Sequence, residues 1–249
     1  EIINSGTTEF NLTRNYTYDE SEDKDYWAFA NYIGIDNLVL DGKGHTLNGG
    51  HQSRIFDFPE GKNITLKNIN FVNATYAIYV QKEPIHIINC NFTGCSGGAI
   101  FDDGSSTIEY CDFIGNSDNL YGAAIYSKSN TTIYDCDFQN NIVTTTTQKG
   151  YGGAIYLDGS SPFVISCYFT NNTVASDYEW AGGGAIYCTD NVKNAYILGC
   201  QFNGNSACEG GAIRAYNNVI INHCGFNGNK AAFGGAVYTS YTISIHNSS

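Results

Sequence analysis

The chain is poor in charge and in proline, and it contains no methionine. Charged side chains make up 14% of its 249 residues, against about 25% in an average soluble domain. Its only arginines are Arg14, Arg54 and Arg214, and the formal net charge is −12. Because phosphate binding needs clustered Lys and Arg, the shortage of basic residues argues against a nucleic-acid-binding surface.

Long apolar runs are also missing. No stretch of about 18 apolar residues occurs, so we expect no membrane insertion by this segment. Tyr, Asn, Thr, Ser and Gly fill the place of charged residues, a mixture that favours pleated strands with polar turns over helices. The sequence starts at Glu1 without a signal peptide and ends soon after a strand-like run at 241–246. We expect the natural chain to continue, because terminal repeats need a polar cover.

One short phrase is abundant: Cys-x-Phe-x-x-Asn and then, after a loop of variable length, Gly-Gly-Ala-Ile-Tyr. Both halves occur in six imperfect copies. The first halves begin at Cys90, Cys111, Cys136, Cys167, Cys200 and Cys224, and the second halves at Gly97, Gly122, Gly152, Gly183, Gly210 and Gly234. Self-similarity with a period of about 20 to 35 residues is typical of stacked structural repeats.

The spacing inside the phrase predicts the shape of one repeat. Cys and Phe are two positions apart, so on a strand both side chains point to the same side. An Ile stands three positions before Cys, which requires a bend where Asn89, Asp135 or Ser166 occurs. Three short strands per repeat predict an all-β fold, a right-handed single-stranded parallel β-helix of about eight or nine coils. We expect an N-terminal cap over residues 1–30 and the repeat domain over residues 31–249.

Alignment of the repeats indicates which side chains face inward. The Ile of Gly-Gly-Ala-Ile-Tyr is always aliphatic and β-branched, which indicates a core position. A position that accepts Arg is expected to reach water, so we predict that the next position, held by Phe101 in the first copy, forms an exterior or half-exposed aromatic column. Its members are Tyr126, Tyr156, Tyr187, Arg214 and Tyr238.

The loop between the two halves of the repeat varies most. From Phe to the first Gly it spans 5 residues after Phe92 and 14 after Phe138, while the strands stay constant. All variable loops should therefore emerge along one edge, which is where solenoids commonly bind. Four loop aromatics are candidate ligand-binding residues, suited to stacking on sugars or anchoring a protein, unless they fold back onto the rod. They are Tyr121, Tyr151, Tyr178 and Trp180.

Residues able to carry chemistry are few. The six repeat-aligned cysteines are expected to pack as buried free thiols, and any disulfide should involve Cys95, Cys188 or Cys208. No Cys or His spacing indicates zinc. Asp102 and Asp103 are interpreted as a turn rather than as a catalytic acid pair. We expect no cofactor and no metal, although the acidic run at 19–25 could hold calcium as part of the cap.

The Phe-x-x-Asn and Gly-Gly-Ala-Ile pair resembles the repeats of polymorphic outer-membrane-protein-type adhesins and of adhesin-like surface proteins of methanogenic archaea. Residues 40–47 (LDGKGHTL) and 63–71 (NITLKNINF) resemble opening coils of the pectate-lyase-like β-helix superfamily. The likeness covers about residues 35–240, with departures at Cys95 and Ala123. It implies adhesion and a location that is extracellular, on the cell surface or in the cell wall, and it provides no catalytic residues. We expect the chain to be a monomer.

Three functions follow as hypotheses. The favoured one is a non-catalytic adhesin-type binding module that recognises a carbohydrate or protein on another cell. The first alternative is a polysaccharide lyase or glycoside hydrolase, which needs carboxylates with Lys or Arg on adjacent coils. The second alternative is a passive stalk, which needs no ligand at any face.

Overall fold

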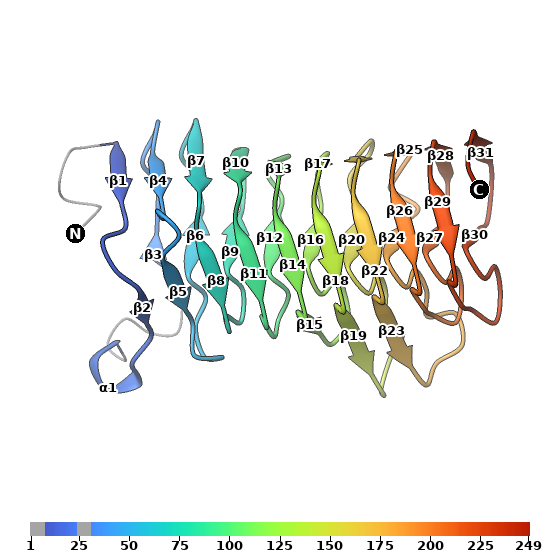
Figure 1. Cartoon of the computed structure of the whole chain (residues 1–249), viewed down its shortest axis with the longest axis horizontal. Coiled ribbons are helices and arrows are strands. Elements are labelled where there is room, and N and C mark those ends of the chain that lie inside the picture. Colours follow the sequence, from blue (N-terminus) through green and yellow to red (C-terminus); the bar gives the residue numbers. More distant parts are fainter. Residues whose placement is uncertain (1–7, 24–30) are drawn as a thin grey trace.

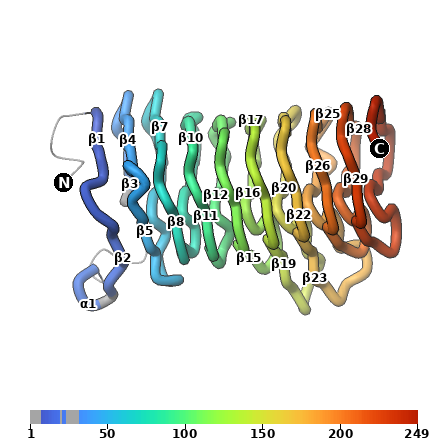
Figure 2. Tube along the Cα trace, in the orientation of Figure 1, coloured from blue at the N-terminus to red at the C-terminus, as the bar shows by residue number. Residues whose placement is uncertain are grey.

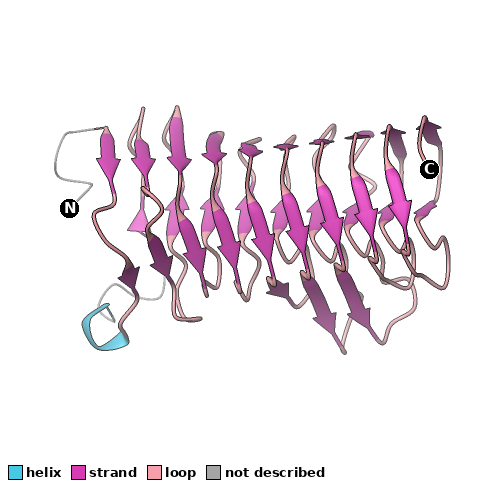
Figure 3. Ribbon diagram, in the orientation of Figure 1, coloured by secondary structure: helices cyan, strands magenta, loops and turns pink. Residues whose placement is uncertain are grey.

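The chain winds into an elongated rod in which each turn adds one strand to each of three parallel sheets (Figure 1). The structure, a computed structural model, describes residues 8–23 and 31–249. Within these ranges almost every element is a strand, and the one helix is the short α1 (Glu20–Asp23) (Figure 3). The prediction of an all-β parallel β-helix is confirmed.

The three sheets run the length of the rod. Sheet A consists of β1 (Glu9–Asn11), β4 (Val39–Asp41), β7 (Ile64–Lys67), β10 (Ile85–Ile88), β13 (Thr107–Glu109), β17 (Thr132–Tyr134), β21 (Phe163–Ile165), β25 (Asn194–Leu198), β28 (Asn218–Asn222) and β31 (Ile243–His246). Sheet B consists of β2 (Tyr16–Thr17), β5 (Thr46–Asn48), β8 (Asn70–Val72), β11 (Asn91–Thr93), β14 (Asp112–Ile114), β18 (Asp137–Gln139), β22 (Tyr168–Thr170), β26 (Gln201–Asn203) and β29 (Gly225–Asn227). Sheet C consists of β3 (Asn31–Tyr32), β6 (Phe56–Phe58), β9 (Ile78–Val80), β12 (Ile100–Asp102), β16 (Ile125–Ser127), β20 (Ile155–Leu157), β24 (Ile186–Cys188), β27 (Ile213–Ala215) and β30 (Val237–Thr239).

The regular coils begin earlier than the sequence indicates. We expected residues 1–30 to be a cap, but β1 pairs with β4 and β2 pairs with β5 in the parallel register of the rod. These strands lack the Cys-x-Phe phrase, which is why the pattern does not reveal them. Residues 1–7 and 24–30 of the expected cap lie outside the described residues. In the described part, α1 starts after Asp19, whose carboxylate accepts a hydrogen bond from the backbone N of Ser21 at 2.8 Å.

Repeated positions form columns through the interior. Phenylalanines of sheet B stack nearly parallel, with Phe92 and Phe113 rings 4.7 Å apart at 5° and Phe113 and Phe138 rings 4.8 Å apart at 3°. The Ile of Gly-Gly-Ala-Ile-Tyr pairs in register on sheet C and is fully buried, as at Ile125 and Ile155, while Val237 in the last copy is partly buried. The predicted core positions are confirmed.

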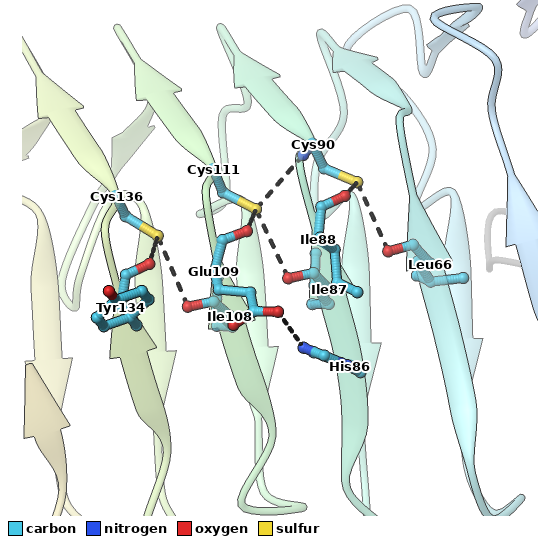
Figure 4. Close-up of polar contacts among 10 residues, drawn as sticks. All are labelled: Leu66, His86, Ile87, Ile88, Cys90, Ile108, Glu109, Cys111, Tyr134 and Cys136. Carbon is cyan, nitrogen blue, oxygen red and sulfur yellow. Dashed lines mark hydrogen bonds and ion pairs between the residues drawn. The ribbon is translucent and has the colours of Figure 1, made fainter. Parts of the chain in front are cut away.

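The cysteine column lies where sheet A turns into sheet B (Figure 4). Each thiol donates to the carbonyl oxygen two residues earlier and to one on the preceding coil. For Cys111 these acceptors are O of Glu109 at 3.2 Å and O of Ile87 at 3.8 Å. All nine cysteines are free, so Cys95, Cys188 and Cys208 form no disulfide. The prediction of a buried free-thiol column is confirmed.

The thiols should differ sharply in reactivity. Cys208 is partly exposed, while the other eight cysteines are buried, and burial raises the pKa of Cys95 to about 11 and that of Cys188 to about 12. Because the thiolate is the reactive form, a chromogenic aromatic disulfide should titrate one thiol in the native protein at pH 8. It should titrate the other eight only after denaturation. Cys208→Ser should abolish the fast phase, and several fast thiols in that variant would contradict the buried column.

A second polar column follows sheet B. The aligned asparagines bond to one another from coil to coil, so that Nδ2 of Asn116 donates to Oδ1 of Asn141 and Nδ2 of Asn141 donates to Oδ1 of Asn172, each at 2.9 Å. Both asparagine side chains donate to a phenylalanine carbonyl as well. At Cys95, where the sequence lacks the asparagine, only the backbone N joins the column, donating to Oδ1 of Asn116 at 3.0 Å.

Corners and glycines have the conformations that the sequence indicates. Asn89 and Asp135 both have φ of 51°, in the left-handed region where a short polar side chain is tolerated. Gly183 has φ of 70°. A Cβ atom on Gly184 would lie 2.1 Å from the carbonyl oxygen of Gly211, so the second glycine of the pair allows neighbouring coils to approach closely.

The variable loops leave the rod on one side, as predicted. Three of them pair with each other as sheet D, which consists of β15 (Ser117–Asp118), β19 (Ile142–Thr145) and β23 (Thr173–Ser176). The tube in Figure 2 shows these segments extending below the coils. A small buried cluster supports these loops and includes one residue each from β19 and β23. Its members are Ala123, Val143, Val174 and Ala181. In the described part of the chain, no helix has the length and hydropathy needed to cross a membrane.

Candidate ligand-binding surface

The residue just before each glycine pair forms a row along the rod. The row, called here the pre-glycine row, connects neighbouring coils by single parallel β-bridges, so its members are one coil apart. They are Tyr121, Tyr151, Gly182, Glu209 and Phe233. The row lies where the protruding loops return to sheet C, so it marks the inner edge of the loop surface.

The outer face of sheet C carries the predicted aromatic column. In register order it contains Tyr79, Phe101, Tyr126, Tyr156, Tyr187, Arg214 and Tyr238. Neighbouring rings are in contact, with centroids 5.0 Å apart between Tyr126 and Tyr156 and 5.5 Å apart between Tyr156 and Tyr187. The sequence predicted a column at this repeat position, which Phe101 also occupies, and the structure extends it to Tyr79 in the coil before.

Two of the four loop aromatics fold back onto this column. The Tyr121 ring is 4.6 Å from that of Tyr156, and the Tyr151 ring is 4.6 Å from that of Tyr187. The backbone at Tyr121 is held in place by Asp118. Oδ1 of Asp118 accepts hydrogen bonds from the backbone N of Leu120 at 2.6 Å and from that of Tyr121 at 2.8 Å. The rings of Tyr121 and Tyr151 are therefore half-buried and packed against the column rather than projecting into solvent.

Two half-buried phenols of this surface, those of Tyr126 and Tyr151, keep their protons at neutral pH. Burial, followed by the nearby carboxylate of Asp158, raises the pKa of Tyr126 to about 12. Burial likewise raises the pKa of Tyr151 above its ordinary value. A phenol that keeps its proton both donates and accepts hydrogen bonds, so at neutral pH this part of the surface is aromatic with polar tips.

The prediction that every position of the column is exterior or half-exposed is wrong at two positions. Tyr187 is only 5% exposed and Arg214 only 4%. Nε of Arg214 lies 2.7 Å from Oε2 of Glu209, which is itself 2% exposed, and the guanidinium lies 4.3 Å from the centre of the Tyr216 ring. The premise that an Arg position must reach water fails because this charge is paired inside the protein. Tyr126, Tyr156 and Tyr238 are half-buried.

Tyr178 lines a groove together with the two folded-back tyrosines. The groove has a volume of about 400 Å³, and its wall also includes Leu120, Thr147, Gln148 and Lys149. Tyr178 is 44% exposed. Its backbone N donates to Oγ of Ser176 at 3.1 Å, and that hydroxyl donates to O of Gln148 at 3.2 Å. Two neighbouring insertions are thus tied together at the groove.

Trp180 pairs with a residue that the sequence analysis missed. Its ring lies 6.4 Å from that of Phe233 and within 7° of parallel. Both rings remain open to solvent, at 52% and 53% exposure. Trp180 also has φ of 74°, a conformation rare for a bulky residue. Phe233 could have been found, because it precedes its glycine pair as Tyr121 and Tyr151 precede theirs.

A separate polar groove lies on sheet A. It has a volume of about 490 Å³ and is lined by Lys62, Asn63, Ile64, Thr65, Glu83, Pro84, Ile85, His86 and Thr107. Nε2 of His86 lies 2.8 Å from Oε1 of Glu109 (Figure 4). Lys62, Glu83 and His86 are the ionisable residues of the lining, and Glu109 adjoins the groove through its contact with His86.

The carboxylate of Asp102 is held by hydrogen bonds from neighbouring residues of the protein. It is fully buried, and its carboxylate accepts hydrogen bonds from the backbone N of Ser106 at 3.0 Å and from Oγ of Ser106 at 2.6 Å. It also accepts from the hydroxyl of Thr131. Across residues 8–23 and 31–249, no group of three or more His, Cys, Asp or Glu side chains is placed to hold a metal ion.

Comparison with known proteins identifies the family. The family model for the right-handed β-helix region matches residues 30–173 and 76–249. No curated protein and no solved structure matches the chain. The matched ranges together run from residue 30 to residue 249 and cover the stacked coils from β3 onward. The chain therefore belongs to the right-handed β-helix family.

Proposed function

We propose that this chain is the binding module of an extracellular, surface-attached adhesin that recognises carbohydrate on another cell. The binding surface is the loop edge, the side of the rod where the variable loops carry Tyr178, Trp180 and Phe233. The observation that carries the proposal is the cluster of solvent-exposed rings beside the groove. Tyr178, Trp180 and Phe233 are between 44% and 53% exposed. Monomeric proteins seldom leave grouped large apolar side chains in water without a binding role.

Carbohydrate fits this surface better than a protein partner does. Sugar rings have apolar C–H faces and polar edges, which match flat aromatic rings fringed by hydrogen-bonding groups. The groove supplies such a fringe with Thr147, Gln148 and Lys149. Its volume of about 400 Å³ suits a small ligand or one or two sugar rings. The likeness of the repeats to adhesin repeats supports the same proposal.

The test is a glycan-array measurement on the wild type and on Tyr178→Ala/Trp180→Ala. If each ring contributes about 1 kcal/mol, the double variant should bind about 30-fold more weakly. The matched control is Tyr110→Ala/Tyr168→Ala, which removes two rings that are 50% and 53% exposed but lie outside the loop edge. This control should bind like the wild type.

Cell-binding assays separate the alternatives. Periodate treatment of target cells destroys vicinal diols of glycans, whereas protease treatment removes protein ligands. Loss of binding only after protease treatment would replace the carbohydrate by a protein partner. Equal binding by the wild type and the double variant would reject the loop edge, and no binding to any glycan or cell would favour the passive stalk.

The sheet A groove supports a second candidate, a polysaccharide lyase or hydrolase. The specific observation is the His86–Glu109 pair beside Lys62 and Glu83, since a positioned acid and base are what glycosidic cleavage needs. Acidic polysaccharides are incubated with the protein, with and without calcium, and assayed for reducing ends and unsaturated uronates. Product formed by the wild type but not by His86→Ala would establish the enzyme reading.

A further inference from the structure

The groove and the Trp180–Phe233 pair lie in line along the rod axis. Tyr121 and Tyr151 of the groove and Phe233 of the pair all belong to the pre-glycine row, whose members are joined rung by rung. Tyr151 and Phe233 are three rungs apart, which is about 14 Å at the usual strand spacing and about the length of three pyranose rings in an extended chain. Tyr151 and Phe233 therefore mark the two ends of one straight track, and Tyr178 and Trp180, two residues apart in one insertion, connect the groove to the ring pair.

The stretch between them offers no obstacle in the pre-glycine row. Gly182 has no side chain, and the stem of Arg214 fills the space where one would lie, since a Cβ there would be 2.9 Å from Cγ of Arg214. The next member, Glu209, is buried against the same arginine. Neither of these two members of the pre-glycine row carries an aromatic ring or an unpaired charge, so the row itself leaves a path for an extended molecule from the groove to the ring pair.

The charge around the track selects against anions. The loops carry Asp177 and Glu179 beside the exposed rings, both exposed, and Lys149 is the one basic residue of the groove lining. The whole chain has a formal net charge of −12. Uronic-acid polymers would be repelled at low salt, where such fields act over distances of about 10 Å or more.

We infer that the groove and the Trp180–Phe233 pair are two subsites of a single site for one uncharged polysaccharide chain lying along the rod axis. The inference rests on the proposed function. Occupying one subsite presents the chain to the other at high effective concentration. The site should therefore bind long chains much more tightly than short ones, although each subsite alone holds only one or two sugar rings.

The experiment measures affinity against chain length by titration calorimetry. The probes are oligosaccharides of two to eight units from β-1,4-glucan, α-1,4-glucan, β-1,4-mannan and β-1,4-xylan, with polygalacturonate and alginate as acidic probes. For a neutral series that binds, we expect affinity to rise at least tenfold between about two and six units and then to level off. The acidic polymers should bind more weakly than that series at low salt.

Two single variants assign the subsites. Trp180→Ala and Phe233→Ala should each weaken the binding of long chains by a larger factor than the binding of a disaccharide or trisaccharide, so that affinity no longer rises with length. Tyr178→Ala should weaken short and long chains by the same factor. Circular dichroism confirms that each variant keeps the fold, which is expected because all three rings are on the surface.

The outcomes distinguish this inference from the proposed function. A neutral series whose affinity does not depend on length, or stronger binding of polygalacturonate or alginate, would overturn the two-subsite site while leaving carbohydrate binding intact. An equal effect of Trp180→Ala on short and long chains would overturn it as well. No binding by any probe, together with a blank glycan array, would reject the proposed function and this inference with it.

Discussion

Removing either partner of the Glu209–Arg214 ion pair should lower the free energy of unfolding by about 3–5 kcal/mol, because the remaining charge is left buried and unpaired. The two side chains are 2% and 4% exposed, and Nε of Arg214 lies 2.7 Å from Oε2 of Glu209. The guanidinium also donates to O of Ala215 and to Oγ of Ser240. Urea unfolding of Glu209→Ala and Arg214→Ala, followed by circular dichroism, measures the loss.

The rod itself supplies the control for this prediction. In two earlier coils the same two positions hold tyrosine pairs, Tyr121 with Tyr126 at 5.2 Å and Tyr151 with Tyr156 at 6.3 Å between ring centroids. The double variant Glu209→Tyr/Arg214→Tyr copies these pairs and leaves no unpaired charge, so it should recover most of the lost stability. A double variant as unstable as the single variants would show that a tyrosine pair cannot replace the ion pair in this coil.

Asn141→Ala should cost about 2–5 kcal/mol of unfolding free energy, because it leaves polar groups without partners inside the rod. Oδ1 of Asn141 accepts from the backbone N of Asn116 at 3.1 Å and from Nδ2 of Asn116 at 2.9 Å. Nδ2 of Asn141 donates to O of Phe113 at 3.0 Å and to Oδ1 of Asn172 at 2.9 Å. The same urea titration measures the effect.

Asn229→Ala is the matched control at the end of the asparagine column. Its side chain accepts from Asn205 and donates to O of Phe202, but it is only half-buried, and water can replace part of what is lost. We expect less than half the effect of Asn141→Ala. Equal decreases in the free energy of unfolding at the two positions would mean that burial does not determine how much these hydrogen bonds contribute to stability.

The parts of the fold that depend on repetition could be predicted from the sequence. The inward Ile, Cys and Phe positions follow from alignment, because an unchanged residue in every coil must meet its own copy in the next. The corner residues follow too, since Asn89 and Asp135 are types that tolerate a left-handed backbone. The protruding edge was visible in the one segment whose length varies.

The parts that depend on exceptions to the repeat could not be predicted in the same way. Arg214 replaces tyrosine in the column, and its burial depends on Glu209, whose role only the three-dimensional pairing shows. The site prediction placed Tyr121, Tyr151, Tyr178 and Trp180 on one edge but could not tell that the first two fold back. That distinction depends on ring contacts between coils, which no local pattern specifies.

The direction of the interstrand hydrogen bonds has a mechanical consequence. In the three long sheets these bonds point from one coil to the next, so they lie along the length of the molecule. A pulling force applied between its two ends would act on every rung at once, and the rungs would open one at a time, since each coil touches only its neighbours. The rod would then extend in a series of small steps and shorten again when released, which makes it a tether that yields gradually under load.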